Sequence, residues 1–374
     1  MESKRPAWIE QRVSSHILSI PPYVPGKPVA ELTRELGIPE AIKLASNENS
    51  LGPSPLAIKA IEDYLIHSSV YPESSGPELR STIASRFHVP PDSIILGNGS
   101  DEIMEMVAHV FLQPGEEAVM AENAFSMYRI CTQAFGGKAV RVALRDYRSD
   151  LAAMAEAVTE RTRLVFLAVP NNPTGTIVSR GEFESFVQHL SKSRLLLVLD
   201  EAYREFVSEL DCPSGRDYVG GPLPVLVLRT FSKIYGLAGL RVGYGIGDPW
   251  LIELLNRVRP PFNVNALAQA AAAAALNDVE HVERSLTMVR SGMEYIVRKL
   301  NEMGLKTIPS QANFVSFCCS TDAKPLYEAL LREGVIVRHL GSFGMEKCIR
   351  VTVGRDAENR RFVEALKETL PRRR

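Results

Sequence analysis

Three side chains that can do chemistry follow three apolar runs of the chain. RLVFLAVPNNPTG contains Asn172, LLLVLDEAY contains Asp200 and VLVLRTFSK contains Lys233. Near-continuous Val/Leu runs separated by helical segments predict strands buried in a largely parallel sheet. Ligands bind beyond the carboxyl ends of such strands, because side chains there face a shared crevice. We therefore expect the amide, the carboxylate and the amine to meet at one site.

The charged residues Asp200, Lys233 and Arg241 also have ordinary structural interpretations. Asp200 fits the N-cap of a helix that starts at Glu201, and Lys233 fits a solvated loop lysine. Arg241, within GLAGLRVGYGIG, fits an ion pair at the rim of a site. The same guanidinium could instead hold a phosphate through two parallel hydrogen bonds.

The segment LGNGSDE adds a possible anion site. Gly99 and Ser100 open a helical segment whose free N–H groups can bind phosphate oxygens. Asp101 and Glu102 place negative charge nearby, which favours this interpretation only if their side chains turn away.

Together these groups match what pyridoxal 5'-phosphate requires. Its aldehyde needs an amine, its ring nitrogen needs an anion that keeps it protonated, and its phosphate needs hydrogen-bond donors. A lysine, an aspartate and an arginine with a glycine turn supply these three functions.

Three motifs then resemble a known family. NNPTG (171–175), DEAY (200–203) and TFSKIYGLAGLRVGY (230–244) are similar to those of the fold-type-I aminotransferases, classes I and II. The resemblance implies that Lys233 forms the Schiff base and moves the proton, and that Asp200 pairs with the ring nitrogen. Tyr203 and Asn172 would bind the ring hydroxyl oxygen, and Phe125 would stack on the ring. The residues implied around the phosphate are Gly99, Ser100, Asp101, Thr230, Ser232 and Arg241.

Narrower motifs indicate one branch of that family. YVPGKP (23–28), KLASNENSLGPSP (43–55), YPESSG (71–76) and VRPPFNVN (258–265) resemble the histidinol-phosphate aminotransferases. This implies reversible, ping-pong transfer of an amino group from histidinol phosphate to 2-oxoglutarate in histidine biosynthesis. It also implies a homodimer with shared sites, in which Tyr71 reaches the cofactor phosphate of the neighbouring subunit. Asn49 would lie near the active site.

Two arginines interrupt apolar strands near the C-terminus. Arg338 in GVIVRHL and Arg350 in KCIRVTVG fit either a solvated strand face or a substrate site. Planar, permanently charged groups suit both the carboxylate of glutamate and the phosphate of histidinol phosphate. The resemblance assigns substrate contacts to Tyr23, Asn49, Asn172, Arg338 and Arg350.

Other functions stay open at this point. An aromatic amino-acid (Phe/Tyr) aminotransferase would use the same fold, since a phenyl ring and an imidazole need similar apolar walls. A threonine-phosphate decarboxylase would share the phosphate site but release carbon dioxide. A dinucleotide-binding oxidoreductase lacks a GxGxxG turn opening a βαβ unit, and a DNA-binding regulator lacks a basic module.

Composition limits the partners. With 43 basic and 44 acidic residues, the net charge of −1 gives no field for nucleic acid or anionic lipid. No apolar run reaches the roughly 18 residues that can span a bilayer, and MESKRPAWIEQ lacks the apolar core of a signal peptide. The five cysteines are scattered without a CxxC pair or histidines at ligand spacing, which predicts no metal site. We expect a reducing cytoplasm and buried, reduced thiols.

The patterning divides the chain into three parts. We expect an arm over 1–45, a large pyridoxal-phosphate-binding α/β domain over 46–265 with a mostly parallel sheet between helices, and a smaller α+β domain over 266–374. The proline-rich arm must pack on the small domain or on a partner subunit. A helical region from Asn265 to Gly304 is predicted to break at Asn277–Asp278.

Overall fold

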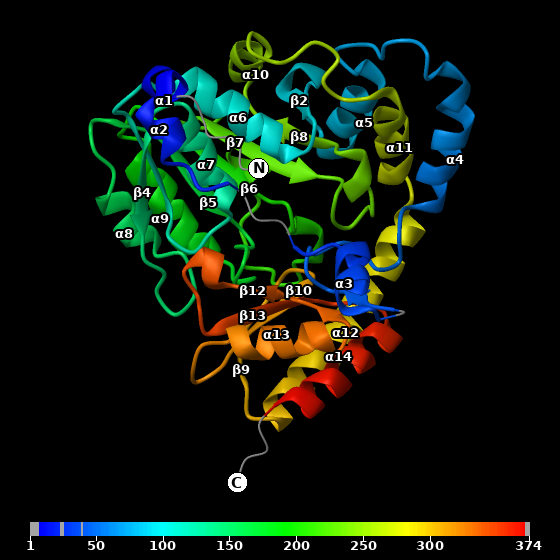
Figure 1. The fold of residues 1–374 in the computed structure, drawn as a ribbon. Coiled ribbons are helices and arrows are strands. Elements are labelled where there is room, and N and C mark those ends of the chain that lie inside the picture. The colour runs from blue at the N-terminus through cyan, green and yellow to red at the C-terminus, as the bar shows by residue number, and fades with distance from the viewer. Residues whose placement is uncertain (1–6, 23–25, 39, 371–374) are drawn as a thin grey trace.

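Two units make up the protein (Figure 1). The computed structural model describes residues 7–22, 26–38 and 40–370. The larger unit contains a seven-stranded sheet in the order β2-β8-β7-β6-β5-β3-β4, in which only β8 runs antiparallel to its neighbours. Its strands are β2 (Ile94–Gly97), β3 (Glu117–Ala121), β4 (Lys138–Val142), β5 (Thr162–Ala168), β6 (Leu196–Asp200), β7 (Val225–Thr230) and β8 (Gly243–Ile246). The predicted mostly parallel sheet is confirmed.

Helices cover both faces of this sheet, which explains why the central strands are apolar throughout. Every residue of β6 and β7 is buried. One core joins alternate strand residues to α6 (Ser100–Phe111), α7 (Ser126–Ala134) and α10 (Pro249–Asn256). The other core joins the intervening residues to helices on the opposite face. These helices are α4 (Pro55–Tyr64), α5 (Pro77–Phe87), α8 (Leu151–Glu156), α9 (Arg180–Leu190) and α11 (Ala266–Leu276).

The smaller unit is built on an antiparallel sheet in the order β12-β13-β10-β9. The strands are β9 (Lys306–Ile308), β10 (Phe314–Cys318), β12 (Arg338–His339) and β13 (Cys348–Thr352). Its helices are α12 (Val279–Glu302), α13 (Lys324–Arg332) and α14 (Asp356–Thr369). Single 3-10 turns are η1 (Leu65–His67), η2 (Pro91–Ser93), η3 (Arg204–Phe206), η4 (Gly215–Tyr218), η5 (Ala238–Leu240) and η6 (Gly341–Phe343).

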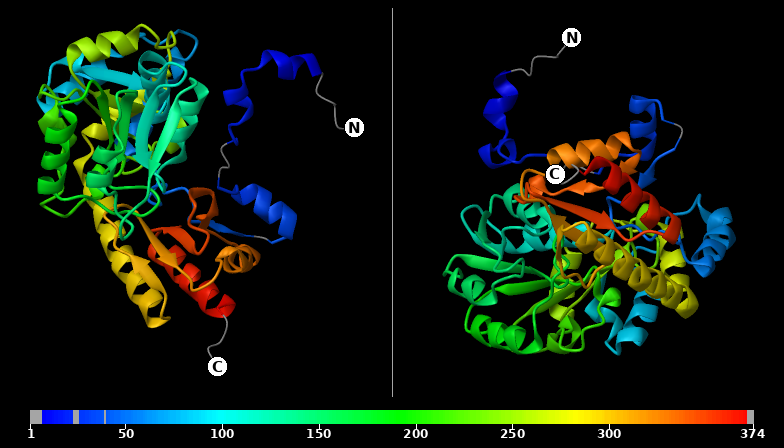
Figure 2. Two further views of the ribbon diagram at one scale, coloured as in Figure 1. Left: turned by 90° about the vertical axis from the view of Figure 1, so that its left-hand side faces the viewer. Right: turned by 90° about the horizontal axis from the view of Figure 1, so that it is seen from below.

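The N-terminal arm reaches this smaller unit. After α3 (Val29–Leu36), the short strand β1 (Ile42–Lys43) pairs in parallel with β11 (Val335–Ile336). The first helices are α1 (Ala7–Arg12), which stands out from the body of the protein in Figure 2, and α2 (Ser15–Leu18), which contacts α7 of the larger unit. The arm thus packs on the smaller unit through β1, whereas the residues of α2 stay exposed or half-buried despite the contact with α7.

The helical region after the large sheet breaks where its sequence predicts. The Asn265 side chain accepts a hydrogen bond from the Ala268 N–H at the start of α11, and Asp278 accepts from the His281 N–H at the start of α12. Helix α11 packs against α4 and α5, and α12 packs against β9, β10 and α14. The three-part division stays a proposal, and this packing favours a boundary at Asp278 rather than after Asn265.

The prediction of reduced thiols is wrong for one pair of cysteines. Cys318 and Cys348 form a disulfide, because the register of β10 and β13 places them directly opposite with Cα atoms 4.1 Å apart. Cys131 and Cys212 are buried free thiols, as expected, and Cys319 is a half-buried one. Sequence spacing could not reveal the pair, because its members lie 30 positions apart in the chain.

Candidate active site

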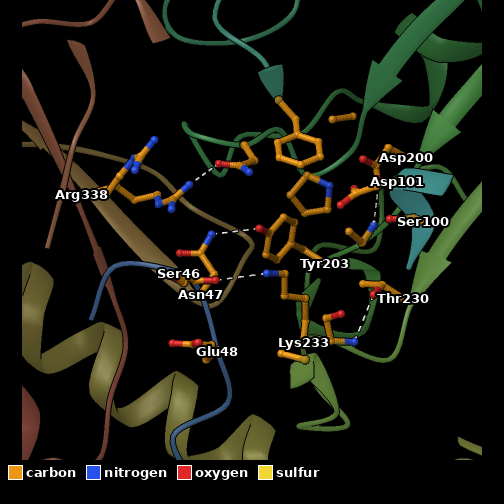
Figure 3. A pocket seen from close by; sticks show the side chains of 18 of the residues that line it. Ser46, Asn47, Glu48, Ser100, Asp101, Asp200, Tyr203, Thr230, Lys233 and Arg338 are labelled. Carbon is orange, nitrogen blue, oxygen red and sulfur yellow. Dashed lines mark hydrogen bonds between the residues drawn. The ribbon is translucent and has the colours of Figure 1, made fainter. Parts of the chain in front are cut away.

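A cavity of about 240 Å³ lies between the two units, at the carboxyl ends of the central strands (Figure 3). Asn172, Asp200 and Lys233 all line it, so the predicted meeting of amide, carboxylate and amine is confirmed. The other predicted site residues that line it are Ser100, Asp101, Phe125, Tyr203, Thr230, Ser232, Arg241, Arg338 and Arg350.

Asp200 ends β6 at the inner wall of the cavity and is only 6% exposed. Its Oδ2 accepts a 2.6 Å hydrogen bond from the Tyr128 hydroxyl, and its Oδ1 accepts from the Ala202 N–H at 3.0 Å. Burial raises the pKa of Asp200 to about 6, while these two hydrogen bonds act in the opposite direction. A buried carboxylate of this kind is suited to a cationic ligand group.

Lys233 lies three residues after β7 and points into the cavity (Figure 3). Its Nζ donates to the Ser46 carbonyl at 3.2 Å and lies 5.6 Å from the centre of the Tyr203 ring. The Tyr203 hydroxyl accepts from Asn47 Nδ2 at 2.9 Å. The amine and the phenol therefore face the same part of the cavity.

An anion cradle lies at the N-terminus of α6. Gly99 has φ +77°, a backbone conformation that favours glycine, and the absence of a Cβ leaves room for the Arg241 guanidinium beside it. Arg241 itself takes the left-handed conformation with φ 55°. Its Nη1 donates to Ser232 Oγ at 3.3 Å, and the Thr230 hydroxyl accepts from the Ser232 N–H at 3.1 Å. Backbone donors, hydroxyls and a guanidinium thus converge, as an oxyanion requires.

The two acidic residues of this turn behave differently. Glu102 turns away, since its Oε2 accepts from the Asn98 N–H and from Asn263 Nδ2. Asp101 Oδ2 instead pairs with Arg241 Nη2 at 3.4 Å. Burial raises the pKa of Asp101, whereas Arg241 lowers it.

Two arginines of the smaller unit form the opposite wall. Arg338 on β12 and Arg350 on β13 are directly paired in the strand register. Arg350 is 5% exposed, and it donates to the Ala45 carbonyl at 2.8 Å and to Asn172 Oδ1. Arg338 donates to Ser342 Oγ at 3.4 Å and lies 5.8 Å from the Phe343 ring centre. The interpretation of Arg350 as a solvated surface residue is therefore wrong.

Some predicted residues lie elsewhere. Asn49 does not line the cavity, because its amide turns back to the Ile234 carbonyl and Ser285 Oγ. Tyr71 is 79% exposed and stacks on Phe262 with ring centres 4.7 Å apart. Tyr23 falls outside the described residues.

Sequence reasoning missed two residues that the structure brings to the cavity. Asn47 lies two positions before Asn49 in the same NEN motif, and its amide reaches Tyr203. Tyr128 lies in the first turn of α7, three positions after Phe125 at the N-cap, and the two rings meet edge-on. This spacing was the available signal for Tyr128.

A metal site and a membrane-spanning helix are both absent from the described residues. Across residues 7–22, 26–38 and 40–370, no group of three or more His, Cys, Asp or Glu side chains is placed to hold a metal ion. No described helix has the length and apolar character to cross a membrane.

Comparisons with known proteins agree with this geometry. The family model "Aminotransferase class I and II" matches residues 39–366. A histidinol-phosphate aminotransferase of Moorella thermoacetica is 48% identical over 95% of this chain and 92% of its own length. A second, from Pseudomonas fluorescens, is also 48% identical, over 95% of this chain and 96% of its own.

A solved structure extends the likeness to three dimensions. Histidinol-phosphate aminotransferase from Sinorhizobium meliloti, in complex with pyridoxal-5'-phosphate, superposes with a TM-score of 0.88 at 29% identity, covering 96% of this chain and 97% of that one. With the cavity, the parallel sheet and the family match in agreement, the chain belongs to the class I and II aminotransferase family.

Proposed function

We propose that this protein is a pyridoxal-phosphate-dependent aminotransferase that moves an amino group between histidinol phosphate and 2-oxoglutarate, in histidine biosynthesis. The observation that carries the choice of substrate is the cross-strand pair of Arg338 and Arg350 at the cavity wall. Two permanently charged, planar guanidinium groups at one cavity wall favour a ligand with carboxylate or phosphate groups. The names of the relatives at 48% identity support the same substrate.

The cavity residues fit the cofactor. A buried carboxylate, Asp200, suits the ring nitrogen, and the cradle around Gly99 and Arg241 suits the phosphate. Phe125 precedes α7 at the cavity and offers an aromatic face to the ring. Tyr203 and Asn172 supply a hydroxyl and an amide for the ring hydroxyl oxygen.

When bound, pyridoxal phosphate supplies an aldehyde that carries the amino group and a protonated ring that withdraws electrons. Lys233 supplies the amine that binds this aldehyde between turnovers. Once displaced by the substrate amine, its Nζ could take a proton from the substrate carbon and deliver it to the carbon that was the cofactor's aldehyde, which the transfer of an amino group requires. The Ser46 carbonyl and the Tyr203 ring restrict where this amine can lie.

The substrates have different anionic groups, and we assign both to the arginine pair. A planar guanidinium binds a carboxylate or a phosphate with two parallel hydrogen bonds, so one pair of arginines can serve glutamate and histidinol phosphate in turn. Asn172 links the two walls, because its Oδ1 accepts from Arg350 while the residue lines the cavity beside Asp200.

We further propose a homodimer with shared sites. Apolar side chains are exposed on the arm and on the segment after α4, among them Trp8 at 65%, Ile66 at 81% and Val70 at 68%. Large exposed apolar groups of this kind mark an interaction surface. Tyr71, exposed beside them, is then available to reach the cofactor phosphate of the other subunit.

A half-reaction titration tests the substrate. The purified protein, loaded with pyridoxal phosphate, is mixed with histidinol phosphate and separately with phenylalanine, and the absorbance of the bound cofactor is followed. Conversion by histidinol phosphate at far lower concentration is expected. If phenylalanine converts the cofactor equally well, the substrate is an aromatic amino acid. Release of carbon dioxide from threonine phosphate would identify a decarboxylase instead.

Mixed dimers test the shared site. Neither Lys233→Ala nor a disabling Tyr71 variant should be active alone, but a dimer of one chain of each contains one native site if Tyr71 acts across subunits. Recovery of activity on mixing is therefore expected. A mixture that stays inactive despite subunit exchange would place Tyr71 in its own subunit's site or in none.

A further inference from the structure

We infer that Tyr128 is a positioning residue of the cofactor site, whose hydroxyl holds Asp200 Oδ2 and keeps this carboxylate as the acceptor for the cofactor's ring nitrogen. The inference rests on the proposed function and adds a residue to it. Tyr128 Oη lies 2.6 Å from Asp200 Oδ2, although 72 positions separate the two residues.

The ring of Tyr128 is held in place on two sides. It is 1% exposed, and it stacks on Phe166 of β5 with ring centres 5.1 Å apart and planes 6° apart. Phe125 meets it edge-on at 5.8 Å. A clamped ring points its hydroxyl in one direction, so the hydrogen bond to Asp200 costs little further ordering.

The hydroxyl can act only as a donor to this carboxylate. Burial and the neighbouring Asp200 raise the pKa of Tyr128 well above its usual value, so the phenol stays protonated. The Ala202 N–H and Lys233 lower the pKa of Asp200 and so favour its charged form. Burial and Asp101 raise this pKa. The neighbouring phenol of Tyr203 also raises the pKa of Tyr128. Tyr128 is the larger of the two hydrogen-bonding contributions that offset burial.

One proton is then shared between the ring nitrogen and Asp200. Stabilising the carboxylate leaves this proton on the nitrogen, where it makes the ring electron-withdrawing. Removing the donor should move the proton toward Asp200. Hydrogen bonds to charged groups are strong enough to change this partition by about 10-fold to 100-fold.

The test uses the cofactor-loaded enzyme with Tyr128→Phe, which removes one oxygen and keeps the packed ring. With ¹⁵N-labelled pyridoxal phosphate, the nitrogen resonance at neutral pH should move toward that of the unprotonated ring. The kcat should fall by about 10-fold while KM changes little. An unchanged nitrogen resonance would overturn the inference.

The matched control is Tyr244→Phe. Tyr244 is also fully buried, but its hydroxyl has no hydrogen-bond partner among the described residues. This variant should leave the nitrogen resonance and kcat unchanged. If it shifts both as Tyr128→Phe does, the effect comes from losing a buried hydroxyl in general, and the inference fails.

A double variant separates positioning from packing. In an Asp200→Asn background, adding Tyr128→Phe should cause no further loss of kcat, because the hydroxyl acts through the carboxylate. A further loss equal to that in the wild type would show that Tyr128 acts by another route. If the wild-type protein binds no pyridoxal phosphate, the proposed function itself fails. This outcome differs from failure of the inference, in which the wild type binds the cofactor but Tyr128→Phe leaves the nitrogen resonance unchanged.

Discussion

Arg338 and Arg350 are direct cross-strand partners on β12 and β13, so two guanidinium groups reach one wall of the cavity opposite the carboxylate of Asp200. The two walls belong to different units of the protein. A substrate held between them would have its anionic groups on the smaller unit and its reacting atoms near Lys233.

Replacing either arginine should weaken both substrates together. Arg338→Ala or Arg350→Ala removes a permanent charge that we assign to carboxylate and phosphate alike, and loss of a charged hydrogen bond raises KM by about 10-fold or more. Steady-state kinetics with histidinol phosphate and glutamate measures this. Arg360→Ala, which removes an exposed ion pair with Asp356 on α14, is the control and should change neither KM. Unchanged KM values for both substrates would remove these arginines from the substrate site.

Lys233→Ala should abolish turnover and still allow the cofactor to bind non-covalently. The cradle and Asp200 remain in this variant, whereas the amine is lost. Borohydride reduction followed by mass spectrometry should find the cofactor linked to Lys233 in the wild type and unlinked in the variant. Exposed Lys192 is the control, and Lys192→Ala should keep both the linkage and the activity. Turnover by Lys233→Ala would refute the assignment of the site.

Asp200 should make the cofactor-free protein less stable as the pH rises. Its pKa is about 6 in the folded protein and about 3.9 in an unfolded chain, so the folded state binds the proton more tightly. Stability is therefore lost between about pH 4 and pH 6, and Asp200→Asn should restore about 1–3 kcal/mol at pH 7.5 and much less at pH 4. Thermal unfolding of the cofactor-free proteins at both pH values measures this. Asp63→Asn, at an exposed position, is the control and should change the stability by less than about 0.5 kcal/mol at either pH. An Asp200→Asn protein that is no more stable at pH 7.5 would contradict the prediction.

A buried ion pair behind the site should be important for folding. Arg229 Nη2 lies 2.5 Å from Glu201 Oε2, Arg229 Nη1 lies 3.3 Å from Glu205, and both members of the closer pair are buried. Arg229→Met would leave the buried carboxylate of Glu201 and the half-buried one of Glu205 without their cation, at a cost of about 3–5 kcal/mol. Denaturant unfolding measures the loss.

The control for this pair lies on the surface. Arg257→Met breaks the exposed Arg257–Glu253 pair, whose atoms are 2.7 Å apart, and should cost under about 1 kcal/mol. If the two variants are equally stable, the buried pair contributes no more than an exposed one.

The fold was largely predictable because its signals are local. The apolar runs of β6 and β7 are long enough to indicate strands buried on both faces, and the side chains that follow them had to meet at one edge. Asn265 and Asp278 likewise mark the starts of α11 and α12 through hydrogen bonds to nearby N–H groups. Fold class, the mostly parallel sheet and the position of the cavity all follow from such short-range patterns.

Other features depended on contacts between distant segments. Asn47 rather than Asn49 enters the cavity because Thr352 Oγ1 and Asn313 Nδ2 bind its backbone from the smaller unit. The disulfide and the arginine pair arise from the register of β13 with its two neighbours.

The sequence by itself thus determined which residue types could do chemistry and on which strand ends they lie, since hydrophobic period and capping act within a few residues. Only the tertiary structure decided that Tyr128 holds Asp200 and that Arg350 reaches Asn172, because these contacts join residues 72 and 178 positions apart. A shift of one residue in register turns a side chain to the other face of a sheet, and packing of whole elements sets that register.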